Sequence, residues 1–169
     1  MHPKRWLLAL ALGFVAAGTA AGEEPSHAGS GMTALGDARA PLRLTAMMAE
    51  HQKRTMRDHL AAVGDIVGAL GRDDLQEVAR QVPRIGYSDG MAQMCSHLGA
   101  ATPGFTDLAL TFHRTADAIG EAARRDDRAG ALAALHRTLQ ACVACHAGYR
   151  QEIVDEATWS HLTDAPKAP

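Results

Sequence analysis

Residues 132–153 read LAALHRTLQACVACHAGYRQEI, and this segment decides the fold of the chain. Its apolar and chemically active residues recur at steps of three and four, the spacing that brings side chains onto one face of a helix. The residues on this stripe are Leu132, Leu135, Leu139, Cys142, His146, Tyr149 and Ile153. The segment therefore predicts a helix that buries Cys142 and His146 on one stripe, with Cys145 one step round the helix.

Residues 142–146 of this helix form the motif C-x-x-C-H, which is the attachment signature of a c-type haem. Two thiols at this spacing can each bond one vinyl group of the macrocycle. His146 then lies beneath the iron and offers its imidazole as the proximal ligand. The motif predicts one covalent haem c per chain, held by Cys142 and Cys145.

A third cysteine, Cys95, leaves an alternative open. We interpret it as a small buried residue of the second helix. The alternative is a haem-free helical bundle in which Cys95 and His97 join Cys142 and Cys145 as zinc ligands, or in which thiols form a disulfide. Two ligands in the pattern C-x-H on one helix have poor geometry for a shared metal, and the zinc site gives the histidine of the motif no role.

The N-terminus predicts export. Lys4 and Arg5 precede an apolar run that is too short for a typical membrane span of roughly 20 residues. Small residues and then two glutamates follow it. We interpret residues 1–22 as a cleaved signal peptide and the protein as periplasmic. Export is compatible with covalent haem attachment, which bacteria carry out outside the cytoplasm.

The rest of the chain is expected to form one domain. Residues 23–41 are rich in Gly, Ala, Ser and Pro, which is typical of a flexible lead-in, and residues 159–169 are expected to be a flexible tail. Residues 42–158 are enough for one core. Aromatic residues make up only 4% of the chain, while Ala and Leu are abundant, which favours packed helices over sheets. The formal net charge of −2 indicates neither nucleic acid nor an anionic membrane as a partner.

Four helical segments are predicted within this domain. They run from about 42 to 70, from 74 to 81 with a restart at 88–98 beyond Pro83, from Thr102 to 123, and from Asp126 or Asp127 to 153. The expected N-caps are Asp73 or Asp74, Ser88, Thr102, and Asp126 or Asp127. Short connections favour antiparallel neighbours, so the predicted fold is an all-α, antiparallel four-helix bundle with the haem on its C-terminal helix.

The segment Cys142 to Arg150, on the last helix of such a bundle, resembles the class II cytochromes c, the family of cytochrome c-prime and its low-spin, methionine-ligated relatives. The likeness covers residues 42–151, and it includes Met56-Arg57-Asp58-His59-Leu60 with Gly64 and Val67 on the first helix. The resemblance implies that Cys142 and Cys145 hold the haem, that His146 is the proximal ligand and that Arg150 lies beside it. Arg150 follows His146 by four residues, so the expected helix brings its charge to the same face.

The sixth iron position is open to more than one residue. Aligned on residues 56–60, the family's usual distal position falls on Lys53, where the family more often has Met, Leu or an aromatic residue. The first helical segment carries a stripe at three- and four-residue steps, which consists of Ala49, Lys53, Met56, Leu60, Val63, Val67 and Leu70. Met56 lies one step beyond Lys53 on this stripe and offers a thioether suited to haem iron. We predict Met56 as a distal ligand, with Lys53 as the alternative. His51 and His59 flank the stripe as weaker candidates.

These features predict a periplasmic c-type cytochrome that carries one electron between periplasmic or membrane redox proteins. The first alternative is a high-spin protein similar to cytochrome c-prime that binds NO or CO at an open sixth position. The second is the haem-free zinc or disulfide bundle. The resemblance also allows a homodimer. No nucleophile–base arrangement, phosphate loop or carboxylate pair is recognised, so we do not expect an enzyme.

Overall fold

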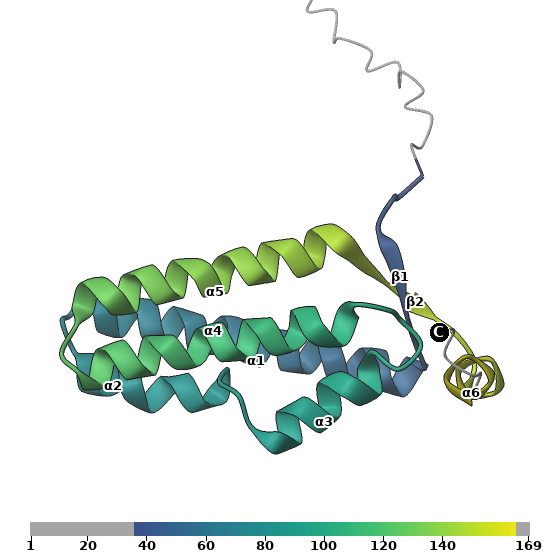
Figure 1. Ribbon diagram of the computed structural model, residues 1–169, viewed down its shortest axis with the longest axis horizontal. Coiled ribbons are helices and arrows are strands. Elements are labelled where there is room, and N and C mark those ends of the chain that lie inside the picture. The colour runs from purple at the N-terminus through teal and green to yellow at the C-terminus, as the bar shows by residue number, and fades with distance from the viewer. Residues whose placement is uncertain (1–35, 165–169) are drawn as a thin grey trace, which may run out of the picture. The chain divides into compact units, whose positions relative to one another are not determined.

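The computed structural model describes residues 36–164, of which 74% lie in helices (Figure 1). The expectation of a mostly helical chain is confirmed. The signal peptide predicted for residues 1–22 lies outside the described residues. Within the described range the elements are β1 (Ala40–Leu44), α1 (Ala46–Gly71), α2 (Leu75–Gln81), the 3-10 helix η1 (Val82–Arg84), α3 (Asp89–Leu98), α4 (Phe105–Arg124), α5 (Arg128–Gly148), β2 (Tyr149–Ile153) and α6 (Glu156–Asp164). None of the helices in this range is long and apolar enough to cross a membrane.

Helix α1 begins later than predicted. Thr45 is its N-cap, and the Thr45 side chain accepts a hydrogen bond from the backbone N–H of Met48. Leu42 and Leu44 lie in β1 instead, where both are buried. Alternation of buried leucines with the half-buried Arg43 is the period of a strand that has one face on the core. The helix prediction was therefore wrong for residues 42–45.

The buried face of α1 is also rotated from the predicted stripe. Ala49, Val63 and Leu70 are buried as expected, whereas Leu60 and Val67 are exposed. The full buried face is Met48, Ala49, Gln52, His59, Ala62, Val63, Ile66, Ala69 and Leu70. Its C-terminal half joins a core cluster that also contains side chains of α2, η1, α4 and α5. The predicted stripe therefore straddles the border between this core and an open side of the helix.

The broken second segment is confirmed. Asp74 caps α2 by accepting a hydrogen bond from the backbone N–H of Glu77, and Pro83 lies within η1. Ser88 then caps α3 by accepting from the N–H of Met91. Each cap satisfies an N–H group that has no partner in the first turn of a helix.

The predicted N-cap of the third segment was wrong. Helix α4 starts at Phe105 behind Gly104, which has a φ of 78° and makes no side-chain cap. Thr102 ties the preceding loop to β1 instead, because its hydroxyl donates to the carbonyl oxygen of Pro41 (3.3 Å) and accepts from the N–H of Arg43 (3.4 Å). The left-handed backbone at Gly104 then turns the chain into the helix.

Helix α5 begins as predicted and ends early. Asp127 is its N-cap and accepts from the N–H of Gly130 (2.8 Å). The helix ends at Gly148, and residues 149–153 form β2, which pairs with β1 in parallel, with Ala40 opposite Tyr149. The all-helical prediction was wrong here, because pairing with β1 satisfies the backbone beyond residue 148. Figure 1 shows the two strands beyond the end of α5.

Helix α6 follows the strands and covers their end of the molecule. Residues 159–164, expected in the flexible tail, belong to this helix. A second core cluster consists of Leu42, Leu44, Met48, Ala49, Leu98 and Phe105. Trp159 of α6 packs against this cluster, and its ring lies edge-on to that of His97, with 5.0 Å between the ring centroids. This second cluster lies at the strand end of the molecule, and the larger cluster lies at the other end.

Candidate functional site

An open cleft of about 850 Å³ is lined by α1, α4, α5 and both strands. Its size is within the range of ordinary small-molecule and cofactor sites, about 300–1,000 Å³. Cys142, Cys145 and His146 all line it, from the last two turns of α5. The structure therefore brings both cysteines and the histidine of the C-x-x-C-H motif to one cleft.

The two thiols of the motif are free and partly buried. Burial raises the pKa of both Cys142 and Cys145 above the usual value, and each has no neighbouring cation among the causes of its shift. A thiol redox catalyst needs the opposite, a lowered pKa that leaves a reactive thiolate at neutral pH. The arrangement is therefore poorly suited to thiol–disulfide exchange.

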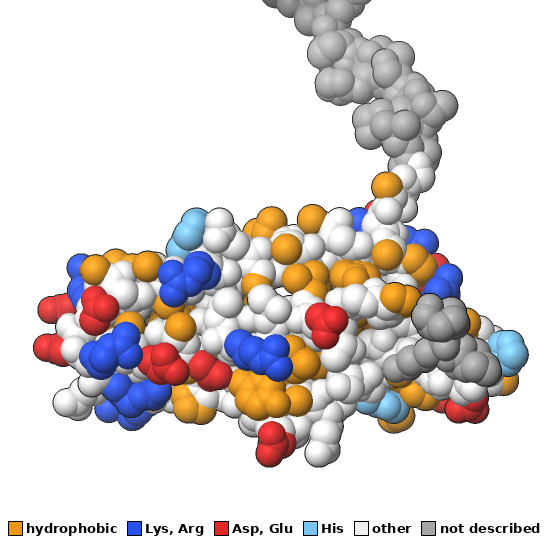
Figure 2. Space-filling view, in the orientation of Figure 1, with side chains coloured by type: hydrophobic (Ala, Val, Ile, Leu, Met, Phe, Trp, Pro, Cys, Tyr) orange, Lys and Arg blue, Asp and Glu red, His pale blue; other side chains and the backbone are white. Residues whose placement is uncertain are grey.

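The other walls are largely apolar and incompletely covered. Met56 and Leu60 of α1 and Leu139 of α5 line it, and their exposed fractions are 38%, 72% and 41%. The space-filling view shows further hydrophobic side chains along α5 at the surface (Figure 2). Exposed apolar side chains gathered around one cleft mark a surface that an apolar partner would cover.

His59 lies deep in this cleft and is only 7% exposed. Its ring stacks on Phe112, and its Nε2 atom is buried without a hydrogen-bond partner in the described residues. Burial, with a smaller contribution from nearby His113, lowers the pKa of His59 from 6.5 to about 4. His113 is also buried, and its Nδ1 donates to the carbonyl oxygen of Ile85 (2.8 Å). His59 is thus a neutral imidazole at neutral pH with an unused polar atom.

Both predicted distal candidates line the cleft, in different states. The ammonium of Lys53 pairs with the carboxylate of Glu50 at 2.8 Å on the surface of α1. Met56 is an unbranched side chain at the mouth of the cleft. One turn earlier on α1, Gln52 accepts a hydrogen bond from the side chain of Gln151 in β2 (2.5 Å).

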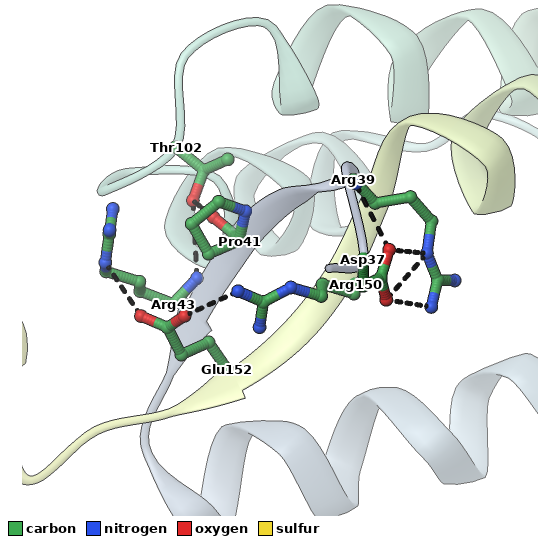
Figure 3. A network of polar contacts seen from close by, with 7 residues as sticks. All are labelled: Asp37, Arg39, Pro41, Arg43, Thr102, Arg150 and Glu152. Atoms are coloured by element: carbon green, nitrogen blue, oxygen red, sulfur yellow. Dashed lines mark hydrogen bonds and ion pairs between the residues drawn. The ribbon is translucent and has the colours of Figure 1, made fainter. Parts of the chain in front are cut away.

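Arg150 does not lie where the helix prediction put it. It belongs to β2, not to α5, so it does not share a helix face with His146. Its guanidinium pairs with the carboxylate of Glu152 at 3.1 Å, and Glu152 also binds Arg43 at 3.2 Å (Figure 3). Arg150 still lines the cleft, so it lies near the motif although it is on β2 and not on the helix.

Asp37 and Arg39 fall in the segment predicted as a flexible lead-in, and neither was predicted to be a site residue. Both line the cleft, and their side chains form a close ion pair (Figure 3). A hydrogen bond from Arg39 lowers the pKa of Asp37 to about 2. The alternation Leu42-Arg43-Leu44 is the one local signal that predicts a strand and hence order in this segment.

The described residues contain no group of three or more His, Cys, Asp or Glu side chains placed to hold a metal ion. The zinc alternative, which needs Cys95 and His97 beside the two motif cysteines, has no such cluster in this range. Cys95 is 5% exposed, and burial raises its pKa. The interpretation of Cys95 as a small buried residue of the second segment is confirmed.

Comparisons with known proteins add no relative. No family model matches the chain, and no similar curated protein or solved structure was found. The functional interpretation therefore rests on the motif, the cleft and the chemistry of the residues that line it.

Proposed function

We propose that the chain is a periplasmic class II c-type cytochrome that carries single electrons between redox proteins. The observation that carries the proposal is that Cys142, Cys145 and His146 line one apolar cleft. In this proposal both thiols bond a haem and His146 is the proximal iron ligand. Helices α1, α2 with α3, α4 and α5 are the four helices of the family's bundle, and the strands and α6 are additions to it.

The residues present fit such a group. A covalent porphyrin is flat and mostly apolar, and the cleft offers exposed Met56, Leu60 and Leu139 as walls. The orphaned Nε2 of His59 is a further sign of an occupant, since a buried polar atom without a partner costs roughly 1–3 kcal/mol.

Met56 is the distal ligand that we favour, because it lines the cleft and its side chain is not held by an ion pair. Gln52 touches the strand that directly follows the motif, and Met56 lies one helical turn beyond it on the same wall. Lys53 would have to leave Glu50 and lose its proton before it could bind iron. The thioether of Met56 needs neither change.

When bound, the haem supplies one-electron chemistry through the Fe(II) and Fe(III) states. The chain supplies the rest. Helix α5 holds both attachment points and the proximal imidazole on one rigid element, and the apolar walls exclude water. Arg39, Lys53, Arg57 and Arg150 line the cleft with Asp37, so its charged lining is predominantly cationic. Cations there can hold carboxylates of the cofactor and adjust the reduction potential.

A second candidate function is binding of NO or CO. The observation that favours it is the aliphatic lining around Leu60 and Leu139, which would admit an uncharged diatomic gas. It requires that Met56 packs against the haem without bonding the iron.

One experiment tests both functions. The full chain is exported from a host competent in c-type haem attachment, and its absorption is recorded oxidised, reduced, and reduced with CO. Sharp reduced bands that ignore CO support the electron carrier. A broad ferrous spectrum that changes with CO supports gas binding. A purified protein without haem on the denatured polypeptide overturns both.

A further inference from the structure

The carbonyl oxygen of His146 has a partner from the other end of the described chain. Arg39 donates to it from Nη1 at 3.2 Å, across 107 residues of sequence. The same guanidinium is held by Asp37 through contacts of 2.6, 2.9 and 3.2 Å. Both side chains line the cleft that contains the motif.

The place of this contact on the helix matters. His146 lies in the last turn of α5, where carbonyl groups run out of partners within the helix. The helix is closed by the N–H of Tyr149, which donates to the carbonyl oxygen of Cys145. The carbonyl oxygen of His146 accepts a hydrogen bond from Arg39 instead. A cation is favourable there, because the C-terminal end of a helix carries partial negative charge. Arg39 thereby fixes the backbone of the proximal histidine itself.

We propose that Arg39 is the positioning residue of His146 and the cation that sets the charge on its side of the cleft. This proposal rests on the proposed haem function. The resemblance assigns that place to Arg150, but the structure pairs Arg150 with Glu152 and turns it away from a shared helix face. Arg39 is the guanidinium in contact with the histidine.

The pair also predicts two shifts of opposite sign. A cation near the iron favours the reduced state, because the oxidised iron carries one more positive charge. Arg39→Gln removes that cation and leaves Asp37 unpaired, so the reduction potential falls. Asp37→Asn removes the opposing anion and leaves Arg39 in place, so the potential rises. A role limited to folding would not produce two opposite shifts.

Arg43→Gln is the matched control. Arg43 lies four residues after Arg39, within β1, and it is similarly exposed and also paired with a carboxylate. Its partner is Glu152, and it makes no hydrogen bond to His146. Potentials of the four haem-loaded proteins are measured at low and at high salt. The expected order is Arg39→Gln lowest, wild type and Arg43→Gln together, and Asp37→Asn highest, with a smaller spread at high salt.

A second readout does not need the iron. The ¹³C shift of the His146 carbonyl reports its hydrogen bond, and it should move in Arg39→Gln and not in Arg43→Gln, in haem-loaded or haem-free full-length protein. Equal potentials for the two arginine variants, or an unmoved carbonyl shift, overturn the role of Arg39 while leaving the cytochrome assignment intact. Absence of covalent haem from the wild-type protein overturns the cytochrome assignment instead.

Discussion

The imidazole of His59 stacks on the ring of Phe112 with their centroids 5.2 Å apart, while the Nε2 atom of His59 is buried without a partner in the described residues. The ring of His113 lies edge-on to both, with its centroid 5.4 Å from that of His59 and 5.0 Å from that of Phe112. Two buried histidines and an aromatic ring thus form part of the lining between the cleft and the core. This cluster should respond to acid.

The haem-free chain is expected to lose stability as the pH falls from about 6.5 to about 4. The pKa of His59 is about 4 in the folded protein and 6.5 unfolded, so the unfolded state binds the proton first. The stability that depends on a neutral His59 is therefore fully present above pH 6.5 and is lost as the pH falls to about 4. The free energy involved is at most about 3.5 kcal/mol, from about 1.4 kcal/mol for each pKa unit. Urea unfolding at several pH values measures it.

His59→Leu should remove most of this pH dependence and leave that of His113, whose pKa burial also lowers. It should also stabilise the haem-free chain at pH 7, because the orphaned nitrogen disappears. His136→Gln is the control, since His136 is exposed. An acid transition in His59→Leu as large as that of the wild type would exclude His59 as its source.

Covalent haem should depend on two of the three cysteines. Cys142→Ala and Cys145→Ala should each leave single-point attachment at best, with less haem on the denatured polypeptide, because each removes one bond to the macrocycle. Cys95→Ala should keep full attachment, since that thiol is buried on α3 and belongs to no metal cluster in the described residues. Haem staining after denaturation, normalised to protein, measures the three variants. Full staining of Cys145→Ala would contradict the attachment model.

The sequence predicted the start of a helix well wherever the capping side chain binds the backbone of that same helix. Asp74, Ser88 and Asp127 cap helices as expected, because an oxygen two or three residues before an N–H is a local relationship. Thr102 has the same local pattern and fails, because its hydroxyl is used by Pro41 and Arg43, about 60 residues away. The one predicted cap that failed is therefore the one whose hydroxyl has distant partners.

The strand after the motif could not be predicted for the same reason. Tyr149 and Ile153 continue the helical spacing of Cys142 and His146, and no local pattern marks where the helix ends except Gly148. The helix ends there because residues 149–153 pair with β1, which lies more than 100 positions earlier in the sequence. The motif residues were identified from sequence, whereas the place of Arg150 and the part played by Arg39 depend on that long-range pairing.

Met56→Ala should distinguish a ligand from a packing residue. If the sulfur bonds the iron, the low-spin spectrum is lost and the reduced protein gains a response to CO. Met47→Ala is the matched control, because Met47 is a methionine of α1 that is 75% exposed and does not line the cleft. Reduced spectra with and without CO measure both variants. An unchanged spectrum in Met56→Ala would assign Met56 to packing and leave the sixth position open for gas binding.

The turn before α4 should be intolerant of a side chain. Gly104 has a φ of 78°, and a Cβ there would lie 3.0 Å from the hydroxyl oxygen of Tyr149, which donates to the carbonyl oxygen of Pro103. Gly104→Ala is therefore expected to destabilise the chain by about 1–2 kcal/mol. It should also loosen the Tyr149 hydroxyl, which joins the start of β2 to the loop before α4.

Gly64→Ala provides the comparison of opposite sign. Gly64 lies inside α1, and a Cβ there meets no atom within 4 Å. Alanine lowers the backbone entropy of the unfolded chain and favours the helix, so this variant should be more stable by about 0.5–1 kcal/mol. Chemical unfolding of the two variants beside the wild type measures the difference. A neutral Gly104→Ala would show that the loop can adopt another backbone conformation and that the Tyr149 contact does not hold it.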